Sequence, residues 1–218
     1  QRQMCIRDRT RIETIKSTEK ITSAMKMVAA ARLRRSQGLI EKCRFYNNNI
    51  LASANRVLFE LRQEEQKKNV RFVYPELMRG SGKAENYLLL VFTSDRGLCG
   101  SYNSNVAREA SKRIEELLGG GKNVKILCIG KKGRDILKRK YAGMIVDTIE
   151  GIARKGAKYY EAVDLGQRVL DMYAKGEFDV CETVSSRFRS AINREIVVRQ
   201  VFPAVSYTHL TLPTNREV

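Results

Sequence analysis

Apolar residues recur at steps of three and four along the first part of the chain, from Thr10 to Leu61. This segment holds no proline and only one glycine, Gly38, so nothing in it is a strong helix breaker. The pattern predicts one long helix over 10–62, with apolar positions at Ile21, Met25, Val28, Leu33, Ile40, Cys43, Ile50, Ala54, Val57 and Leu61. At about 1.5 Å per residue such a helix extends roughly 75–80 Å, beyond the diameter of a small domain. We therefore expect it to lie against another long helix, as in a coiled coil, or inside another protein.

The pattern changes after this helix. Residues 63–85 are charged and interrupted by Pro75, Gly80 and Gly82, which is typical of a linker. Beyond the linker, strands are predicted over 86–93, 124–129, 144–149, 178–187 and 195–202, and helices over 103–118, 132–140 and 158–174. The first strand, NYLLLVFT, is apolar throughout, as in a strand buried on both faces. This order predicts an α/β fold, in which the long N-terminal coiled-coil helix precedes a Rossmann-like, mostly parallel α/β lobe over 86–204.

Two of the predicted helices have apolar residues gathered on one face. In the helix over 103–118 that face consists of Val106, Ala110, Ile114 and Leu117. In the helix over 158–174 it consists of Tyr159, Ala162, Val163, Gly166, Val169, Leu170 and Tyr173.

Both ends of the chain lack the periodicity of their neighbours. We predict that 1–9 is a non-native leader and that 205–218, VSYTHLTLPTNREV, which resembles translated sequencing-adaptor sequence, is a non-native tail. A native disordered tail is the alternative. The only histidine, His209, lies in this tail, so setting it aside removes every histidine-based catalytic or metal site.

Composition adds one extreme value, a formal net charge of +17. It predicts a partner that is acidic: a protein surface, nucleic acid or anionic lipid. No apolar run approaches the roughly 18–20 residues that cross a bilayer, and no signal peptide precedes the helix, so we expect a soluble, non-secreted protein. The five cysteines include no CxxC pair, which favours reduced thiols over a disulfide framework or a zinc site.

The turn over 93–105, TSDRGLCGSYNSN, is the first place to look for chemistry, because glycines between a strand and a helix can cradle a phosphate. The signal is weak, since the turn has neither GxxxxGK[ST] nor a complete GxGxxG. Cys99 lies near Arg96 but has no base partner, so a structural or interface role is favoured over a reactive thiolate. Asp95 is better explained as a turn cap or a neighbour of Arg96 than as a general base. We predict no catalytic, cofactor-binding or metal-binding residue.

The helical segment from Arg11 to Arg44 carries nine basic and three acidic residues. A solvated helix face would explain the charge alone. However, small and flexible apolar residues occupy much of the circumference there, namely Met25, Met27, Val28, Ala29, Ala30 and Ala31, and this favours a helix contacted from several sides. Aromatic residues that could stack on bases are absent from 10–44, which disfavours nucleic acid as the partner.

Three motifs in combination resemble the gamma subunits of rotary F-type ATP synthases: KITSAMKMVAAARLRRSQ at 20–37, SDRGLCGSYNSN at 94–105 and SSRFRSAI at 185–192. The resemblance covers about 10–204. It implies a central rotor shaft that couples ion-driven rotation to ATP synthesis or hydrolysis and is not itself an enzyme. The long helix would pair with an antiparallel C-terminal helix inside a ring of alpha and beta subunits, and the lobe would contact an epsilon-type subunit and the membrane c-ring. No cofactor, nucleic acid or small-molecule substrate is implied.

The resemblance also implies which residues contact the beta subunits, whose facing loop is acidic. On the long helix these are Met25, Lys26, Arg32, Arg34 and Arg35; in the turn they are Arg96, Gly97, Cys99 and Gly100. The expected location is the cytoplasmic face of a bacterial inner membrane, as a peripheral protein, or an organellar inner membrane.

The chain departs from the family pattern in two further places. Ser101 stands where a second glycine is common, and the C-terminal helix of the family does not follow the lobe. Two other classes stay open. One is a basic coiled-coil scaffold or nucleic-acid-binding protein with an α/β lobe, and the other is an α/β enzyme with a helical arm.

Overall fold

The computed structural model describes residues 2–68, 78, 80–152, 158–190 and 193–203. The chain forms two compact units, 1–71 and 72–218, and each is described by itself.

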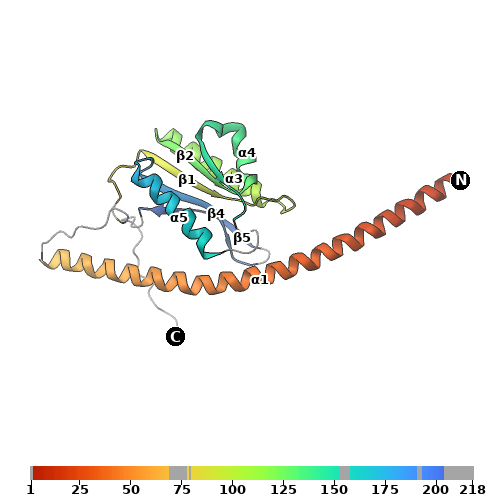
Figure 1. Ribbon diagram of the computed structural model, residues 1–218, viewed down its shortest axis with the longest axis horizontal. Helices are drawn as coiled ribbons and strands as arrows, with labels where there is room; N and C mark the ends of the chain where they lie inside the picture. The colour runs from red at the N-terminus through yellow and green to blue at the C-terminus, as the bar shows by residue number, and fades with distance from the viewer. Residues whose placement is uncertain (1, 69–77, 79, 153–157, 191–192, 204–218) are drawn as a thin grey trace. The chain divides into compact units, whose positions relative to one another are not determined.

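The first unit is a single α-helix, α1 (Arg2–Lys68), drawn from red to orange in Figure 1. It contains the predicted helix over 10–62 and extends beyond it at both ends, because the adjoining residues include no proline or glycine and, after residue 62, are mostly glutamine, glutamate and lysine, which are good helix formers. Part of the predicted linker is therefore helical, while 69–77 and residue 79 lie outside the described residues. That 1–9 is a non-native leader stays a prediction.

A row of threonines follows one side of α1 near its start. The hydroxyls of Thr10, Thr14, Thr18 and Thr22 each donate to the backbone carbonyl four residues earlier, at 2.8–3.1 Å. Because these hydroxyls already donate to carbonyls of the helix, this side of α1 offers methyl groups to its surroundings and few free hydrogen-bond donors.

The second unit is built on a sheet of five strands: β1 (Asn86–Phe92), β2 (Asn123–Ile129), β3 (Ile145–Ile149), β4 (Val180–Phe188) and β5 (Arg194–Phe202). Their order across the sheet is β3-β2-β1-β4-β5. All neighbours are parallel except β4 and β5, which pair antiparallel. The predicted open, mostly parallel Rossmann-like sheet is thus confirmed.

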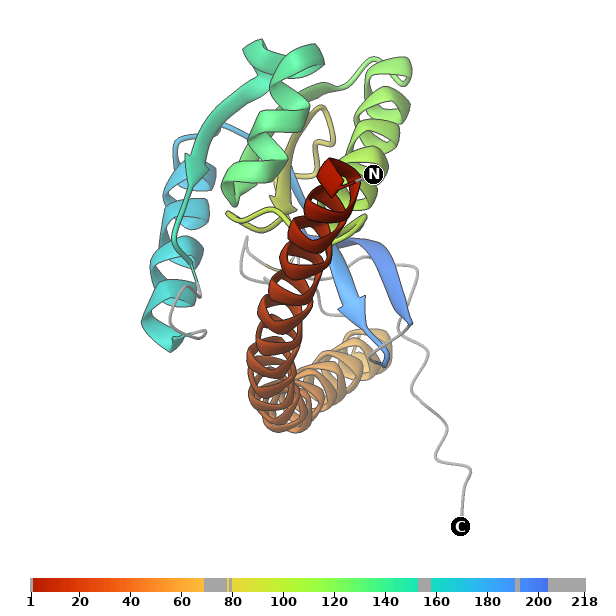
Figure 2. The same ribbon diagram turned by 90° about the vertical axis from the view of Figure 1, so that its right-hand side faces the viewer.

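Helices cover both faces of this sheet, as Figure 2 shows. The helices α3 (Tyr102–Gly119) and α4 (Lys131–Tyr141) pack on one face, and α5 (Tyr159–Ala174) packs on the other. A short 3-10 helix, Ala142–Met144, leads from α4 into β3. The core therefore has two layers, one on each side of a sheet whose central strand β1 is buried on both faces.

The predicted apolar face of α3 is confirmed, since Val106, Ala110, Ile114 and Leu117 are all buried against the sheet. The predicted face of α5 is partly wrong. The side that packs on the sheet is centred on Leu165, Val169, Met172 and Tyr173, whereas Tyr159, Val163 and Leu170 are exposed. Apolar residues extend round more than half of α5, so the helical period alone does not select which of them meet the sheet.

Asp179, just before β4, forms hydrogen bonds with the segment that leads into β1. Its carboxylate accepts the backbone N–H groups of Glu85 at 3.2 Å and Asn86 at 3.0 Å, the side-chain amide of Asn86 at 3.1 Å and the hydroxyl of Ser81 at 3.1 Å. Burial alone would raise the pKa of Asp179, but these donors hold that pKa below its ordinary value. The carboxylate thus fixes where the chain enters the sheet.

The chain also leaves the lobe at this point. Gly80 has a φ of +73°, and a Cβ placed on it would lie 2.9 Å from Cγ of Pro203, directly after β5. Only glycine fits this contact. The entry and exit of the lobe are therefore side by side.

Candidate partner-binding site

The turn between β1 and α3 is held by a hydrogen-bond network around Asn103. Its side chain is buried, with 8% exposed, and its Oδ1 accepts the backbone N–H of Ser94 at 2.9 Å. Its side-chain amide donates to Oγ of Ser94 at 2.9 Å and to Sγ of Cys99 at 3.0 Å. The Ser94 hydroxyl in turn donates to the carbonyl of Arg96 at 2.6 Å. Because Asn103 belongs to the first turn of α3, the helix fixes the shape of the turn before it.

This network decides which of the predicted contact residues reach the surface. Arg96, Gly97 and Gly100 are exposed, whereas Cys99 is half-buried with its sulfur directed into the network. Leu98, which the sequence analysis did not select, is 99% exposed. The signal that points to it in the sequence is an apolar residue placed between the glycines of a surface turn, in GLCG.

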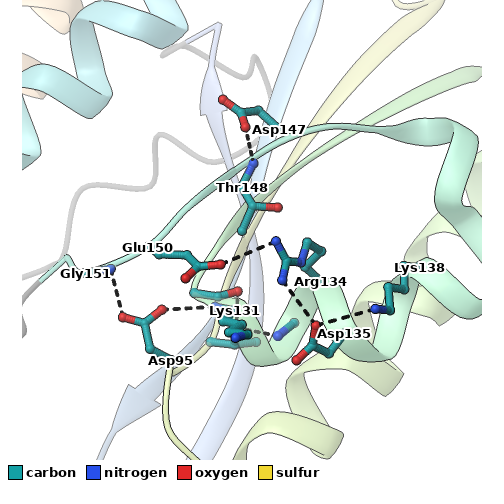
Figure 3. Close-up of polar contacts among 12 residues, drawn as sticks. Asp95, Lys131, Arg134, Asp135, Lys138, Asp147, Thr148, Glu150 and Gly151 are labelled. Atoms are coloured by element: carbon teal, nitrogen blue, oxygen red, sulfur yellow. Dashed lines mark hydrogen bonds and ion pairs between the residues drawn. The ribbon is translucent and has the colours of Figure 1, made fainter.

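Asp95 points the other way, across the carboxyl end of the sheet (Figure 3). One carboxylate oxygen accepts the backbone N–H of Lys131 at the start of α4, at 3.0 Å, and the other accepts the backbone N–H of Gly151 after β3, at 2.8 Å. The prediction that Asp95 caps its own turn is wrong, because both of its carboxylate oxygens bind backbone N–H groups of other elements, at the start of α4 and after β3. In open α/β sheets this edge and these helix N-termini are where anionic ligands commonly bind. Here a carboxylate of the chain itself takes one of those N–H groups.

Two glycines at the start of α4, Gly130 directly before it and Gly133 in its first turn, allow close packing at the same edge. A Cβ on Gly130, which has a φ of +105°, would lie 2.4 Å from the carbonyl oxygen of Thr93, and one on Gly133 would lie 2.7 Å from Oγ1 of Thr93. The backbone N–H of Gly133 donates to that hydroxyl at 2.8 Å. Glycine at both positions therefore leaves room for Thr93 beside the backbone.

Charged side chains surround this edge in partly exposed pairs, also drawn in Figure 3. Arg134 lies 3.4 Å from both Asp135 and Glu150, and Lys138 lies 3.9 Å from Asp135. Asp147 accepts the backbone N–H of Thr148 at 2.6 Å, which is the main reason why the pKa of Asp147 lies below its ordinary value. Exposed pairs of this kind add little to stability.

The remaining predicted contact residues lie on α1, and all of them are exposed: Met25, Lys26, Arg32, Arg34 and Arg35. The four cations among them form no ion pair within the described part of the chain. At 100° per residue, Met25 and Arg32 share one side of the helix, whereas Lys26 and Arg34 project to other sides. These residues therefore surround α1, and they lie in a different unit from Arg96, Gly97, Cys99 and Gly100.

The described residues show little sign of metal binding, reactive thiols or membrane-spanning helices. Among the described residues, no group of three or more histidine, cysteine, aspartate or glutamate side chains is arranged to hold a metal ion. Burial raises the pKa of the Cys128 thiol to about 11 and that of Cys181 to about 12, so both stay protonated at neutral pH. Within the same described part of the chain, no helix combines the length and apolar character needed to cross a membrane.

Comparison with known proteins gives a consistent result. The family model for ATP synthase matches residues 7–217. The chain is 40% identical over 196 residues to the ATP synthase gamma chain of Sinorhizobium medicae, a match that covers 90% of this chain and 65% of that one. It is 42% identical over 196 residues to the ATP synthase gamma chain of Rhizobium leguminosarum bv. trifolii, covering 90% and 64%. The chain thus spans less than two thirds of the length of these curated relatives. The matched range includes residues of both ends that the sequence analysis set aside, and their non-native origin stays a prediction.

Among solved structures, the central stalk and c-ring of the mitochondrial ATP synthase of Tetrahymena thermophila contains a chain similar to this one. The TM-score is 0.62 at 27% identity, and the match covers 84% of this chain and 72% of that chain. The range that the family model matches, 7–217, contains the three motifs at 20–37, 94–105 and 185–192. The chain therefore belongs to the ATP synthase family, in which the proteins it resembles are gamma chains.

Proposed function

We propose that this protein acts as the central rotor shaft of an F-type ATP synthase, coupling ion-driven rotation to ATP synthesis or hydrolysis on a ring of alpha and beta subunits without being catalytic itself. The observation that carries the proposal is α1, a helix of 67 residues, most of whose described apolar and basic side chains are exposed. A helix of this length draws most of its stability from packing, so its surroundings must come from partners. Similarity to a solved central stalk supports the same assignment.

The geometry of the lobe supports a two-helix shaft. Because Gly80 packs on Pro203, the segments on either side of the lobe start from one place. In this proposal, a helix follows Pro203 in the complete subunit and pairs with the N-terminal helix. The relatives are longer than this chain, which leaves room for such a helix. It would cover the apolar positions Ile50 and Val57, which are 48% and 56% exposed here.

The charge supports acidic contacts in the ring. We propose that Met25, Lys26, Arg32, Arg34 and Arg35 on α1, and Arg96, Gly97, Cys99 and Gly100 in the turn, contact the beta subunits. The net charge of +17 fits an acidic partner surface, and so do Lys26, Arg32, Arg34 and Arg35, which form no ion pair in the described part of the chain. Contacts of the lobe with an epsilon-type subunit and the c-ring, and a peripheral position on the cytoplasmic face of a bacterial inner membrane, belong to the same proposal.

Coupling in this proposal is a matter of differential contact energy. An asymmetric shaft meets each beta subunit differently, so each rotation step favours a different conformation and nucleotide affinity at each site. The shaft can bias a site only by the difference between its contact energies with the two conformations. No chemical group of the shaft needs to take part in hydrolysis.

Reversal of charge on α1 tests the contact. In the complete subunit assembled with its ring, replacing both Arg34 and Arg35 with Glu should impair assembly or the coupling of ion flow to ATP chemistry. Because the attraction between shaft and ring is weaker in this variant, its binding to the ring should depend less on salt concentration than wild-type binding does. The matched control replaces the exposed pair Arg108 and Lys112 of α3 with Glu, which changes the net charge equally. Normal coupling with Arg34 and Arg35 reversed would remove them from the interface.

Nucleotide turnover tests the absence of catalysis. The isolated chain should not hydrolyse ATP, because its β1–α3 turn lacks a phosphate-binding lysine. Added to an alpha/beta ring, the complete subunit should raise the turnover of the ring, and Cys99→Ser should leave that stimulation largely intact. Hydrolysis by the isolated chain would favour an α/β enzyme, and tight DNA binding with a steep salt dependence would favour a nucleic-acid-binding protein.

A further inference from the structure

Leu98 is the most exposed apolar residue of the lobe in the part that the structure describes. Its side chain is 99% exposed, and the next value, that of Tyr159, is 84%. Leu118 and Ile136 are more typical, with 39% each. A single exposed apolar residue is common on protein surfaces and by itself implies nothing. The backbone beneath Leu98 is what makes it unusual.

Leu98 adopts a left-handed backbone conformation, with a φ of +59°, and is the only residue other than glycine with a positive φ among those described. This region disfavours side chains with a Cβ, and for a bulky residue it is a clear outlier. Glycine would adopt it without cost. Glycines occupy two neighbouring positions, Gly97 and Gly100, yet position 98 carries a leucine. The chain therefore keeps an unfavourable conformation that brings no contact within its own lobe.

The turn beneath Leu98 is anchored on both sides. Ser94 and Cys99 are hydrogen-bonded to the buried Asn103 of α3, and Asp95 accepts the backbone N–H groups of Lys131 at the start of α4 and of Gly151. An outlier of this kind persists only where the surroundings fix it. Figure 1 shows the turn as the yellow-green loop that stands out between β1 and α3. Leu98 is thus presented in an ordered position, so little conformational entropy remains to be lost on binding.

We propose that Leu98 is the apolar anchor through which the lobe docks on a subunit of the catalytic ring. It enters an apolar recess bordered by carboxylates, which receive the exposed Arg96 two residues earlier. This inference rests on the proposed function and assigns its turn a specificity-determining residue. An apolar side chain in a fully desolvated pocket, surrounded by polar contacts, is the usual form of a binding hot spot.

The experiment compares substitutions at Leu98 in the complete subunit, with affinity for an alpha/beta ring as the first measurement and thermal unfolding of the lobe as the second. Leu98→Ala should weaken binding about 10- to 100-fold, as expected when the burial of one leucine side chain is lost. Leu98→Met should stay within about threefold, because it preserves apolar volume. The control Ile136→Ala removes an exposed apolar side chain from α4 and should not change binding.

Leu98→Gly separates anchoring from a merely structural role. Glycine relieves the left-handed strain, so the lobe should unfold at an equal or higher temperature while ring binding falls as far as with Leu98→Ala. Wild-type binding by Leu98→Gly, or equal losses for Leu98→Ala and Ile136→Ala, would overturn the inference and leave the shaft proposal standing. Failure of the wild-type subunit to bind the ring would overturn both.

Discussion

The two units of this protein differ in how far their apolar side chains are buried. In the lobe, Leu88, Leu89 and Val91 of β1 are fully buried between helices on both faces of the sheet. On α1, many of the described apolar side chains are exposed, for example Ile12 at 52% and Val57 at 56%. The lobe therefore completes its own core, whereas α1 exposes a surface that only a partner can cover. The lobe thus has a core of its own, and in the proposed function α1 is an interface.

Charges differ in the same way. In the lobe, Arg113 of α3 forms two bonds of 2.7 Å with the buried Glu182 of β4, and Lys140 of α4 pairs with Glu115 of α3. These pairs connect elements of one fold. The cations Arg34 and Arg35 on α1 have no such partner in the described part of the chain. Arg113 and Lys140 thus connect elements within the lobe, while Arg34 and Arg35 on α1 stay available to an acidic surface.

Hydrogen exchange provides the largest expected contrast. In the isolated chain, amides of β1 and β2 should exchange at least about a thousandfold more slowly than those of 10–61, because opening the lobe core costs most of a domain's unfolding free energy while a lone helix frays. Mass spectrometry at several protein concentrations measures this. Protection of α1 that rises with concentration would indicate self-association through its apolar stripe. Strong protection in a monomer would contradict the comparison.

Truncation of single apolar residues should show the same contrast in stability. Leu89→Ala in β1 should lower the free energy of unfolding of the lobe by about 2–5 kcal/mol, since it leaves a cavity in a fully packed core. Val57→Ala on α1 should change that free energy by less than about 0.5 kcal/mol, because the side chain is largely solvated before and after the change. Denaturant unfolding measures both. A cost above 1 kcal/mol for Val57→Ala would mean that the lobe covers this part of α1.

Much of this architecture could be predicted from the sequence. The central strands β1 and β2 were found because they are buried on both faces and read as apolar runs, and α3 was found because its apolar period is narrow and clear. The face of α5 was partly misassigned because Tyr159, Val163 and Leu170 are apolar but exposed. Periodicity reports which residues are apolar, and only tertiary packing decides which of them are buried.

The candidate site was less accessible to prediction. The role of Asp95 in capping α4 and that of Asn103 in holding the turn depend on contacts between elements that are distant in sequence or on the exact shape of the turn. Leu98 was missed because its left-handed conformation is set by that surrounding network, not by its own preference. The contact residues on α1 and in the turn came from family resemblance and stay a prediction.

Acid should destabilise the lobe through Asp179. The pKa of this carboxyl lies below its ordinary value in the folded protein, so its contribution to stability is present above the unfolded pKa of about 3.9 and is lost as the pH falls through the folded pKa. Asp179→Asn should cost about 1–3 kcal/mol at pH 7 and should reduce the loss of stability seen below about pH 4. Asp164→Asn, at an exposed position of α5, is the control. An unchanged acid profile in Asp179→Asn would show that other groups dominate.

The smallest expected effect lies on α1, where stability is local. The Thr18 hydroxyl donates to the carbonyl of Thr14 at 2.8 Å, and it has no bond to another element in the described part of the chain. Thr18→Ala should therefore raise the helix content of α1 slightly. Alanine favours the helix over threonine by about 0.5 kcal/mol, because it loses less side-chain freedom there. Thr18→Val, which keeps the branched shape without the hydroxyl, is the matched control and should change the content little. Circular dichroism of the isolated chain measures both. A marked loss of helix in either variant would mean that this face of α1 already packs against something, and the contrast with the lobe would no longer hold.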